Sequence, residues 1–309
     1  MNMKMLHLAA VLVLLLLAPT LADEVPKTVA SVYPSICAGA LRDAVLSDLG
    51  DGVIAECEDI KVTLKDIEDE IARSPEHMRE QVRKYPVHVL EQAVIERLIA
   101  KEALDWAKKS GKSTAGDAAV NAYVWSQMQK VDVTDVEALE FYEEHASMFG
   151  GVPFEQIKDV IVNVVREEKN SDAQNRFKHS VGKRHSIKVS SSWMEAQSKK
   201  WSQNPIEKAR LSGKPTLVVF SVIGCCDRMR PVIDVVRDKY ADKLNVIFIN
   251  ISEEGILSSI YGVSTIPVEI FYDAGGKEVF RNKRAMSVED VVEKFKELGV
   301  ALDTGGGCE

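Results

Sequence analysis

The spacing of apolar residues changes character near residue 205. Beyond this point, apolar runs typical of strands buried on both faces alternate with stretches that repeat at helical spacing. The pattern predicts seven elements: strand 217–221, helix 228–240, strand 244–251, helix 254–261, strands 268–272 and 278–281, and helix 288–298. Asp273-Ala274-Gly275-Gly276 supplies the hairpin turn between the last two strands. We therefore expect an α/β domain in which an antiparallel hairpin extends a parallel pair of strands.

The region before residue 190 is predicted to be mainly α-helical. Apolar residues recur at helical spacing from 64 to about 109, with Thr63 as the N-terminal cap and with Pro75 and Pro86 marking helix starts or breaks. Further elements are expected as a loosely helical stretch at 33–51, helices at 117–129, 135–144 and 154–177, short strands at 53–55, 60–62 and 183–189, and a polar helix at 193–201.

The first residues have the pattern of a cleaved export signal. Lys4 precedes an apolar run at 6–18, and Thr20-Leu21-Ala22 offers a small-x-small cleavage site. The run is shorter than the roughly 20 residues that a membrane-spanning helix needs. We therefore expect a signal peptide at 1–22, export to the periplasm and no stable membrane span after cleavage; an uncleaved anchor is the alternative.

Length and composition indicate a two-domain globular protein. The chain has 309 residues, of which 46% are hydrophobic and 28% charged. Its net charge of −8 argues against nucleic acid as a partner, because phosphate binding needs clustered Lys and Arg. The predicted organisation is a signal peptide at 1–22, a helical domain at 23–189, a linker at 190–204, an α/β domain at 205–300 and a flexible tail at 301–309.

Three segments of the C-terminal third resemble the thioredoxin family. They are TLVVFSVIGCCDRMRP at 216–231, YGVSTIPV at 261–268 and DAGGKEVF at 273–280. In order, they resemble that family's strand with active-site turn, its later loop with a cis proline facing the cysteines, and its terminal hairpin. The resemblance implies a thioredoxin fold in which the backbone of Thr265, Ile266 and Pro267 binds an extended substrate beside the thiols. An ordinary turn proline is the alternative for Pro267.

The cysteines depart from that family's pattern. Thioredoxin-type chemistry uses two thiols separated by two residues at a helix start, where the helix dipole favours the thiolate. Here those two residues are missing, so Cys225 and Cys226 are adjacent. A disulfide between adjacent cysteines closes a strained eight-membered ring and is easily reduced. Val219 stands where many thioredoxins carry a buried acid, and Gly224 stands where an aromatic residue is usual.

Three interpretations of the adjacent pair stay open. In the first, Cys225 is the nucleophile, and Cys226 or an external thiol resolves the mixed disulfide. In the second, both thiols are inert in a degenerate redox fold kept for binding. In the third, the two thiolates capture a soft metal, although no His or further Cys lies nearby in the sequence to complete a site.

The other three cysteines and the histidines carry weaker signals. Cys37 and Cys57 flank a Gly-rich turn, and a disulfide between them would stabilise the fold by about 3 kcal/mol, with two unpaired thiols as the alternative. Cys308 follows three glycines and is expected in a tail without a role. The alternatives are a mobile thiol partner for Cys225 or Cys226 and an intermolecular crosslink. We predict no cofactor and no metal site, because the histidines have no metal-ligand spacing: His77, His88, His145, His179 and His185.

The helical region resembles the N-terminal chaperone domain of SurA-type exported foldases. The resemblance rests on VTLKDIEDE at 62–70, LEQAVIERLIAKEAL at 90–104 and VTDVEALEFYEEH at 133–145. It implies binding of unfolded or extended polypeptide. The space between 152 and 205 leaves no room for a parvulin domain, so no prolyl isomerase activity is expected.

Together these features predict an exported, two-domain protein that acts on polypeptides. Thiol–disulfide exchange at Cys225 and Cys226, coupled to chaperone-like binding of unfolded or extended exported polypeptides, is the function expected, with a thiol-recycling partner protein. The alternative is a non-enzymatic periplasmic chaperone or interaction protein with a degenerate redox site.

Overall fold

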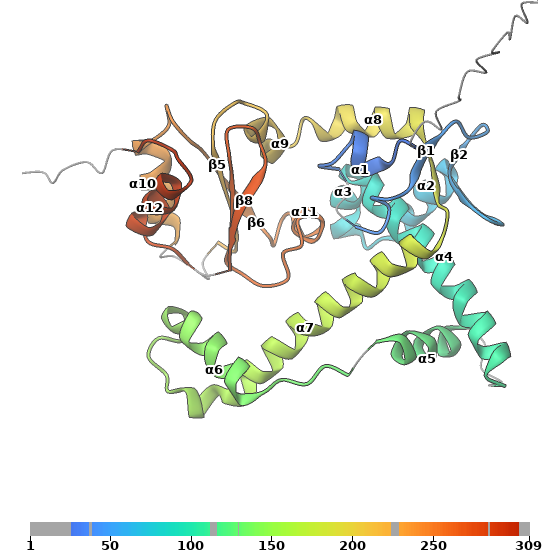
Figure 1. Cartoon of the computed structure of the whole chain (residues 1–309), viewed down its shortest axis with the longest axis horizontal. Coiled ribbons are helices and arrows are strands. Elements are labelled where there is room, and N and C mark those ends of the chain that lie inside the picture. Colours follow the sequence, from blue (N-terminus) through green and yellow to red (C-terminus); the bar gives the residue numbers. More distant parts are fainter. Residues whose placement is uncertain are drawn as a thin grey trace, which may run out of the picture.

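The computed structural model describes residues 26–36, 39–111, 116–128, 130–223, 229–283 and 285–302 (Figure 1). The chain is mixed, with many helices and two separate four-stranded sheets. No helix within these ranges is long and apolar enough to span a membrane. The predicted signal peptide at 1–22 and the tail beyond 302 lie outside the described residues.

Three consecutive helices open the helical region: α2 Leu64–Arg73, α3 Glu76–Lys84 and α4 Pro86–Lys109. The Thr63 hydroxyl accepts a hydrogen bond from the Asp66 amide, and the Asp66 carboxylate accepts one from the Thr63 amide at 2.7 Å. This reciprocal cap satisfies two amides that would otherwise lack partners. Pro75 and Pro86 separate the three helices, as the sequence predicts.

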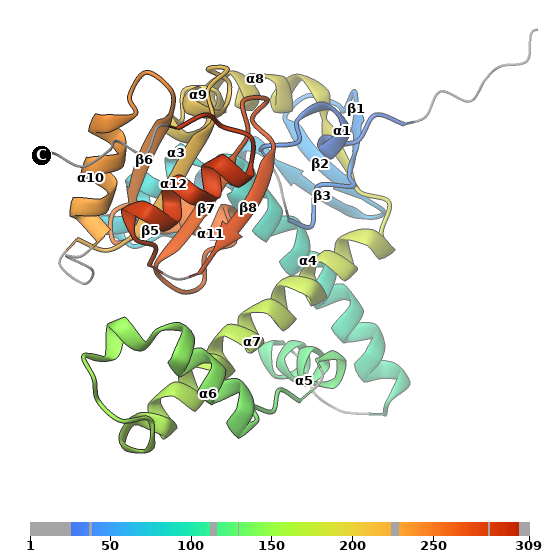
Figure 2. The same cartoon turned by 60° about the vertical axis from the view of Figure 1, so that its left-hand side comes forward.

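The next helices form an arm that is set apart from the sheets (Figure 2), except at its far end, where His145 contacts Lys283 of the C-terminal region. They are α5 Asp117–Gln127, α6 Asp135–Glu144, the 3-10 helix η1 Ala146–Phe149 and α7 Phe154–Arg184. Gly150 and Gly151, with φ of 60° and 83°, form the turn between η1 and α7. α7 continues past its predicted end at 177, and it packs against both α4 and α6. Near the far end of the arm, Ala138, Ile161 and Val165 form a small apolar cluster of their own.

A four-stranded sheet joins the two ends of the helical region. Its strands are β1 Val45–Ser47, β2 Val53–Cys57, β3 Ile60–Thr63 and β4 Lys188–Ser190, in the order β1-β4-β2-β3. The strands predicted around Cys57 are confirmed. The strand predicted at 183–189 is present only as β4, because α7 continues to Arg184. The prediction of a loosely helical 33–51 is wrong at 45–47, because β1 pairs in parallel with β4. Local spacing gives no sign of a partner so distant in the chain.

The predicted linker contains the polar helix expected there. α8 Ser191–Trp201 follows β4 directly and buries Met194 and Trp201. α9 Pro205–Arg210 follows and was not predicted; its Glu207 is buried and paired with Arg210 at 2.5 Å.

The seven elements predicted for the C-terminal region are all present. They are β5 Thr216–Ser221, α10 Met229–Lys239, β6 Asn245–Asn250, α11 Gly255–Ile260, β7 Val268–Tyr272, β8 Glu278–Asn282 and α12 Val288–Glu297. The sheet order is β6-β5-β7-β8, with β5 parallel to β6 and antiparallel to β7. This is the predicted parallel pair extended by an antiparallel hairpin.

The two faces of this sheet belong to different apolar clusters. Leu217 and Val219 lie with residues of α10 and α12, including Ile233 and Phe295. The alternate residues, Val218 and Phe220 among them, belong to the cluster that fills the helical region. The apolar core therefore runs without a break from the helical region onto one face of the second sheet.

Polar and aromatic contacts reinforce this junction. The Tyr85 hydroxyl and the Lys84 ammonium each bond the Glu254 carboxylate at 2.9 Å. The Trp201 ring stacks on Tyr261, with ring centroids 6.3 Å apart, and meets Tyr85 edge-on. At the far end of the arm, the buried His145 imidazole bonds the Lys283 carbonyl at 2.9 Å.

Candidate functional site

The predicted substrate loop lies at one end of the second sheet. β7 begins directly after Pro267, and its first residue, Val268, pairs with Phe220 of β5. Pro267 is therefore beside Ser221, the last residue of β5. The Ile266–Pro267 peptide bond is cis, as the resemblance implies.

The loop is anchored at its start and open at its centre. The Val263 amide donates to the Ser258 carbonyl at 2.9 Å, and the Arg281 guanidinium donates to the Tyr261 carbonyl at 2.9 Å. Thr265 and Ile266 are half-buried. None of the hydrogen bonds between described residues uses the backbone of Thr265 or Ile266. The binding of an extended substrate by these peptide groups stays a prediction.

The adjacent cysteines, Cys225 and Cys226, lie outside the described residues. Their segment connects Ile223, which follows β5, to Met229, the first residue of α10. β5 ends at the sheet end that also carries Pro267. The juxtaposition of the two thiols with Thr265, Ile266 and Pro267 stays a prediction.

A buried acid lies two residues after Pro267. Glu269 is fully buried on β7, and its carboxylate accepts hydrogen bonds from the Asn282 side chain and the Met286 amide, each at 3.2 Å. Burial raises the pKa of Glu269 from 4.5 to about 7, although both hydrogen bonds act in the opposite direction. Near neutral pH this carboxyl can therefore hold or release a proton.

Glu269 is not predicted as a site residue from the sequence. Its position becomes meaningful through the register between β5 and β7. Val219, which stands where many thioredoxins carry a buried acid, is the direct cross-strand partner of Glu269. Cross-strand partners project from the same face of a sheet, with Cβ atoms about 5 Å apart. The structure therefore places a carboxyl beside Val219 from the neighbouring strand. The available signal was a single charged residue within the apolar run 268–272.

Cys57, the predicted disulfide partner of Cys37, is a free and buried thiol in the structure. Cys37 lies outside the described residues, so their pairing stays a prediction. Burial, and secondarily the charge of Glu58, raises the pKa of the Cys57 thiol. This cysteine consequently lacks the environment of an activated nucleophile.

Comparison with known proteins supports the assignment of the C-terminal fold. No family model matches the chain. Thioredoxin from Acidithiobacillus ferridurans is 35% identical over 69 residues, which are 22% of this chain and 64% of that protein. Thioredoxin from Alicyclobacillus acidocaldarius is 32% identical over 71 residues, which are 22% of this chain and 68% of that protein. The C-terminal region belongs to the thioredoxin family.

Two solved structures each match 27% of this chain. One, titled as a malarial protein, is 15% identical and covers 27% of this chain and 96% of its own, with a TM-score of 0.26. Another, titled as thioredoxin-2 and a component of the malaria parasite's protein secretion machinery, has the same identity and TM-score and is covered over 82% of its length. The chain spans about two thirds of the curated thioredoxins it matches. The SurA-type resemblance of the helical region rests on its sequence motifs alone.

Proposed function

We propose that this protein is exported, that it exchanges thiols and disulfides with polypeptides, and that its helical region holds those polypeptides. The observation that carries the proposal is the end of the second sheet. There the loop at Thr265–Pro267 and the buried acid Glu269 lie beside the end of β5, and Cys225 and Cys226 follow β5 in the sequence. The thioredoxin relatives support the same chemistry.

The proposed reaction conserves atoms and electrons. The Cys225 thiolate attacks one sulfur of a client disulfide, which forms a mixed disulfide and releases one client thiolate. Cys226, or an external thiol, then attacks the Cys225 sulfur and releases the second client thiolate. The client gains two electrons, the protein is left as a disulfide, and a recycling thiol partner restores it.

Glu269 gives this exchange a local proton source and acceptor. Each attacking thiol must lose a proton and each departing thiolate gains one. A carboxyl whose pKa lies near 7 is suited to both transfers at neutral pH. Glu269 lies beside Val219 and supplies the buried carboxyl that many thioredoxins carry at the position of Val219.

The arm formed by α5, α6 and α7 is the proposed holding surface. It exposes large apolar side chains that have no covering element in the described chain: Trp125, Val136, Leu139, Val160 and Val164. Extended segments of unfolded polypeptides carry apolar side chains that would cover these positions. The same surface favours the second candidate, a non-enzymatic chaperone.

Reduction of an insulin-type disulfide substrate tests the enzymatic proposal. Wild type should reduce it, and Cys225→Ser should abolish the rate. Glu269→Gln should lower the rate about tenfold or more, since it keeps the shape but loses the exchangeable proton. Cys308→Ser is the matched control and should behave as wild type. Equal rates for wild type and Cys225→Ser would refute thiol exchange as the function.

Aggregation of an unfolded client separates the second candidate. If suppression by Cys225→Ser equals that of wild type while neither reduces insulin, the protein is a chaperone without redox activity. Loss of suppression in a Trp125→Ser and Val160→Ser double variant would assign holding to the arm. Unchanged suppression in that variant would contradict the assignment.

A further inference from the structure

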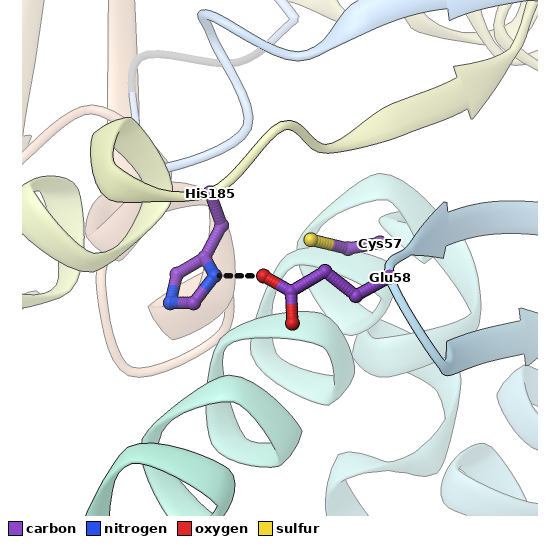
Figure 3. A group of neighbouring side chains, drawn as sticks. All are labelled: Cys57, Glu58 and His185. Atoms are coloured by element: carbon purple, nitrogen blue, oxygen red, sulfur yellow. Dashed lines mark hydrogen bonds and ion pairs between the residues drawn. The ribbon is translucent and has the colours of Figure 1, made fainter.

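Three side chains that can ligate a metal converge beside the first sheet (Figure 3). Cys57 ends β2, Glu58 begins the turn to β3, and His185 follows the last residue of α7. One ligand atom from each lies within 4.8 Å of the other two. Residue spacing does not predict this group, since more than a hundred positions separate His185 from the other two.

A carboxylate behind His185 fixes the orientation of its ring. Glu102 Oε1 lies 3.1 Å from His185 Nε2, and Glu102 is itself held by Arg184 at 2.9 Å and by the Tyr123 hydroxyl at 2.8 Å. A carboxylate on one ring nitrogen selects the tautomer in which that nitrogen carries the proton. The other nitrogen, Nδ1, then presents its lone pair to Glu58 and Cys57.

This arrangement leaves two acceptors face to face. His185 Nδ1 lies 3.2 Å from Glu58 Oε1, and both atoms carry lone pairs when Nε2 holds the single ring proton. Either a second proton or a cation must lie between them. Ligands about 2.0–2.1 Å from a tetrahedral zinc ion are roughly 3.3 Å apart, which matches the observed separation.

The backbone and the local charges fit a cation. Glu58 has φ of 55°, a conformation uncommon for a residue other than glycine, and it points the carboxylate toward His185. Its second oxygen binds Lys101 at 2.7 Å, so Oε1 is free to ligate. With Cys57 as thiolate, the cluster has four anionic groups (Cys57, Glu58, Asp59, Glu102) and two cations, Lys101 and Arg184. A divalent ion would neutralise the two negative charges that remain.

The geometry points to a transition-metal site for an ion of the zinc class, bound by Cys57 Sγ, Glu58 Oε1 and His185 Nδ1. Sulfur, nitrogen and oxygen donors together suit Zn²⁺ rather than Mg²⁺ or Ca²⁺. Water would fill the fourth position, because the Glu58 side chain is half exposed. The bound ion would tie the β2–β3 turn to the connection between α7 and β4, and so fasten the beginning of the helical region to its end.

Cobalt binding tests the site separately from thiol exchange. The reduced full-length chain with Cys225→Ser, Cys226→Ser and Cys308→Ser retains only Cys37 and Cys57. It should bind one equivalent of Co²⁺ with a thiolate-to-cobalt charge-transfer band, and Zn²⁺ should displace the cobalt. Further substitution of Cys57 by Ser should abolish the band, whereas Cys37→Ser, the matched control, should keep it.

Two histidine variants and one supporting acid complete the test. His185→Gln should lose binding, and His179→Gln, a substitution within α7, should bind as the parent does. Glu102→Gln should weaken affinity about 10- to 100-fold, as for other groups that orient a ligating histidine. Thermal unfolding without metal identifies variants that are misfolded. If a variant of a buried ligand does not fold, Glu58→Gln replaces it in the test, because the Glu58 side chain is half exposed, and this variant should also lose metal binding. A band that survives Cys57→Ser, no band in the parent, or a Cys37–Cys57 disulfide in the mature protein would overturn the proposal.

Discussion

At the residue scale, Glu269 is the side chain with the most unusual environment in the thioredoxin-like region. It is fully buried, and its pKa of about 7 exceeds its ordinary value of 4.5. A raised pKa means that the folded state binds the proton more tightly than the unfolded state does. Between about pH 4.5 and 7 the native protein therefore holds more protons, and its stability falls as the pH rises through this interval.

Glu269→Gln should remove this pH dependence. The free energy of unfolding of wild type should fall by up to about 3 kcal/mol between pH 4.5 and pH 7.5 from this group alone. The glutamine variant lacks that loss and should be the more stable protein at pH 7.5, by an amount on the order of 1–3 kcal/mol. Urea unfolding of both proteins at the two pH values measures the difference. Parallel profiles for the two proteins would contradict the assigned pKa.

The sequence predicts several residues of the candidate site, but it does not predict which of them are neighbours in space. The apolar run at 217–221 and the motif at 261–268 predict where the loop at Pro267 lies. They do not reveal Glu269 as the neighbour of Val219, because that follows only from the register between β5 and β7. His185 and Cys57 likewise become neighbours only through the pairing of β2 with β4.

At the element scale, the cap of α2 is supported by an ion pair between Asp66 and Arg97, which lies on α4. Asp66 Oδ2 accepts hydrogen bonds from the Thr63 amide and hydroxyl. The other oxygen, Oδ1, accepts one from the Arg97 guanidinium at 2.7 Å. Bonds from Thr63 first, and then from Arg97, lower the pKa of Asp66 to about 2. The stability that this carboxylate contributes is present above about pH 4 and is lost as the pH falls toward 2.

Thr63→Ala should destabilise the protein by about 1–2 kcal/mol, because it removes the side-chain cap of α2. Thr63→Ser keeps the hydroxyl and should cost only a few tenths of a kcal/mol. Urea unfolding at pH 7 measures both. An alanine variant as stable as the serine variant would show that the cap contributes nothing.

Element types were predictable where the pattern is local and long. The capped helix after Thr63, the breaks at Pro75 and Pro86 and all seven C-terminal elements follow from spacing and turn residues. Strand β1 does not, since three residues gain their conformation by pairing with β4. The spacing predicts an end of α7 at about 177 because its last turns are polar, whereas tertiary contacts maintain the helix to Arg184.

At the scale of the whole molecule, one apolar cluster joins the helical region to the second sheet. Trp201 lies at this junction, 9% exposed, between Tyr85 of the first part and Tyr261 of the second. The sequence indicated a linker between two domains at 190–204. It did not indicate that Trp201, the last residue of the helix in this linker, contacts both parts.

Trp201→Ala should weaken the coupling between the two parts. We expect a loss of about 3–5 kcal/mol, since a large buried aromatic side chain is removed, and a broader or two-step unfolding transition. Trp125→Ala is the matched control, because Trp125 is 77% exposed and its loss should change stability by less than about 0.5 kcal/mol. Urea unfolding followed by circular dichroism distinguishes the two. A sharp single transition with unchanged midpoint in Trp201→Ala would contradict the coupling.

Capture of a mixed disulfide tests the central claim, thiol–disulfide exchange at Cys225, most directly. Cys226→Ser removes the resolving thiol and should accumulate a covalent complex with a disulfide-containing client, released by added reductant and mapped by mass spectrometry to Cys225. Cys225→Ser should accumulate none. A complex that forms equally in both variants, or in neither, would contradict the account.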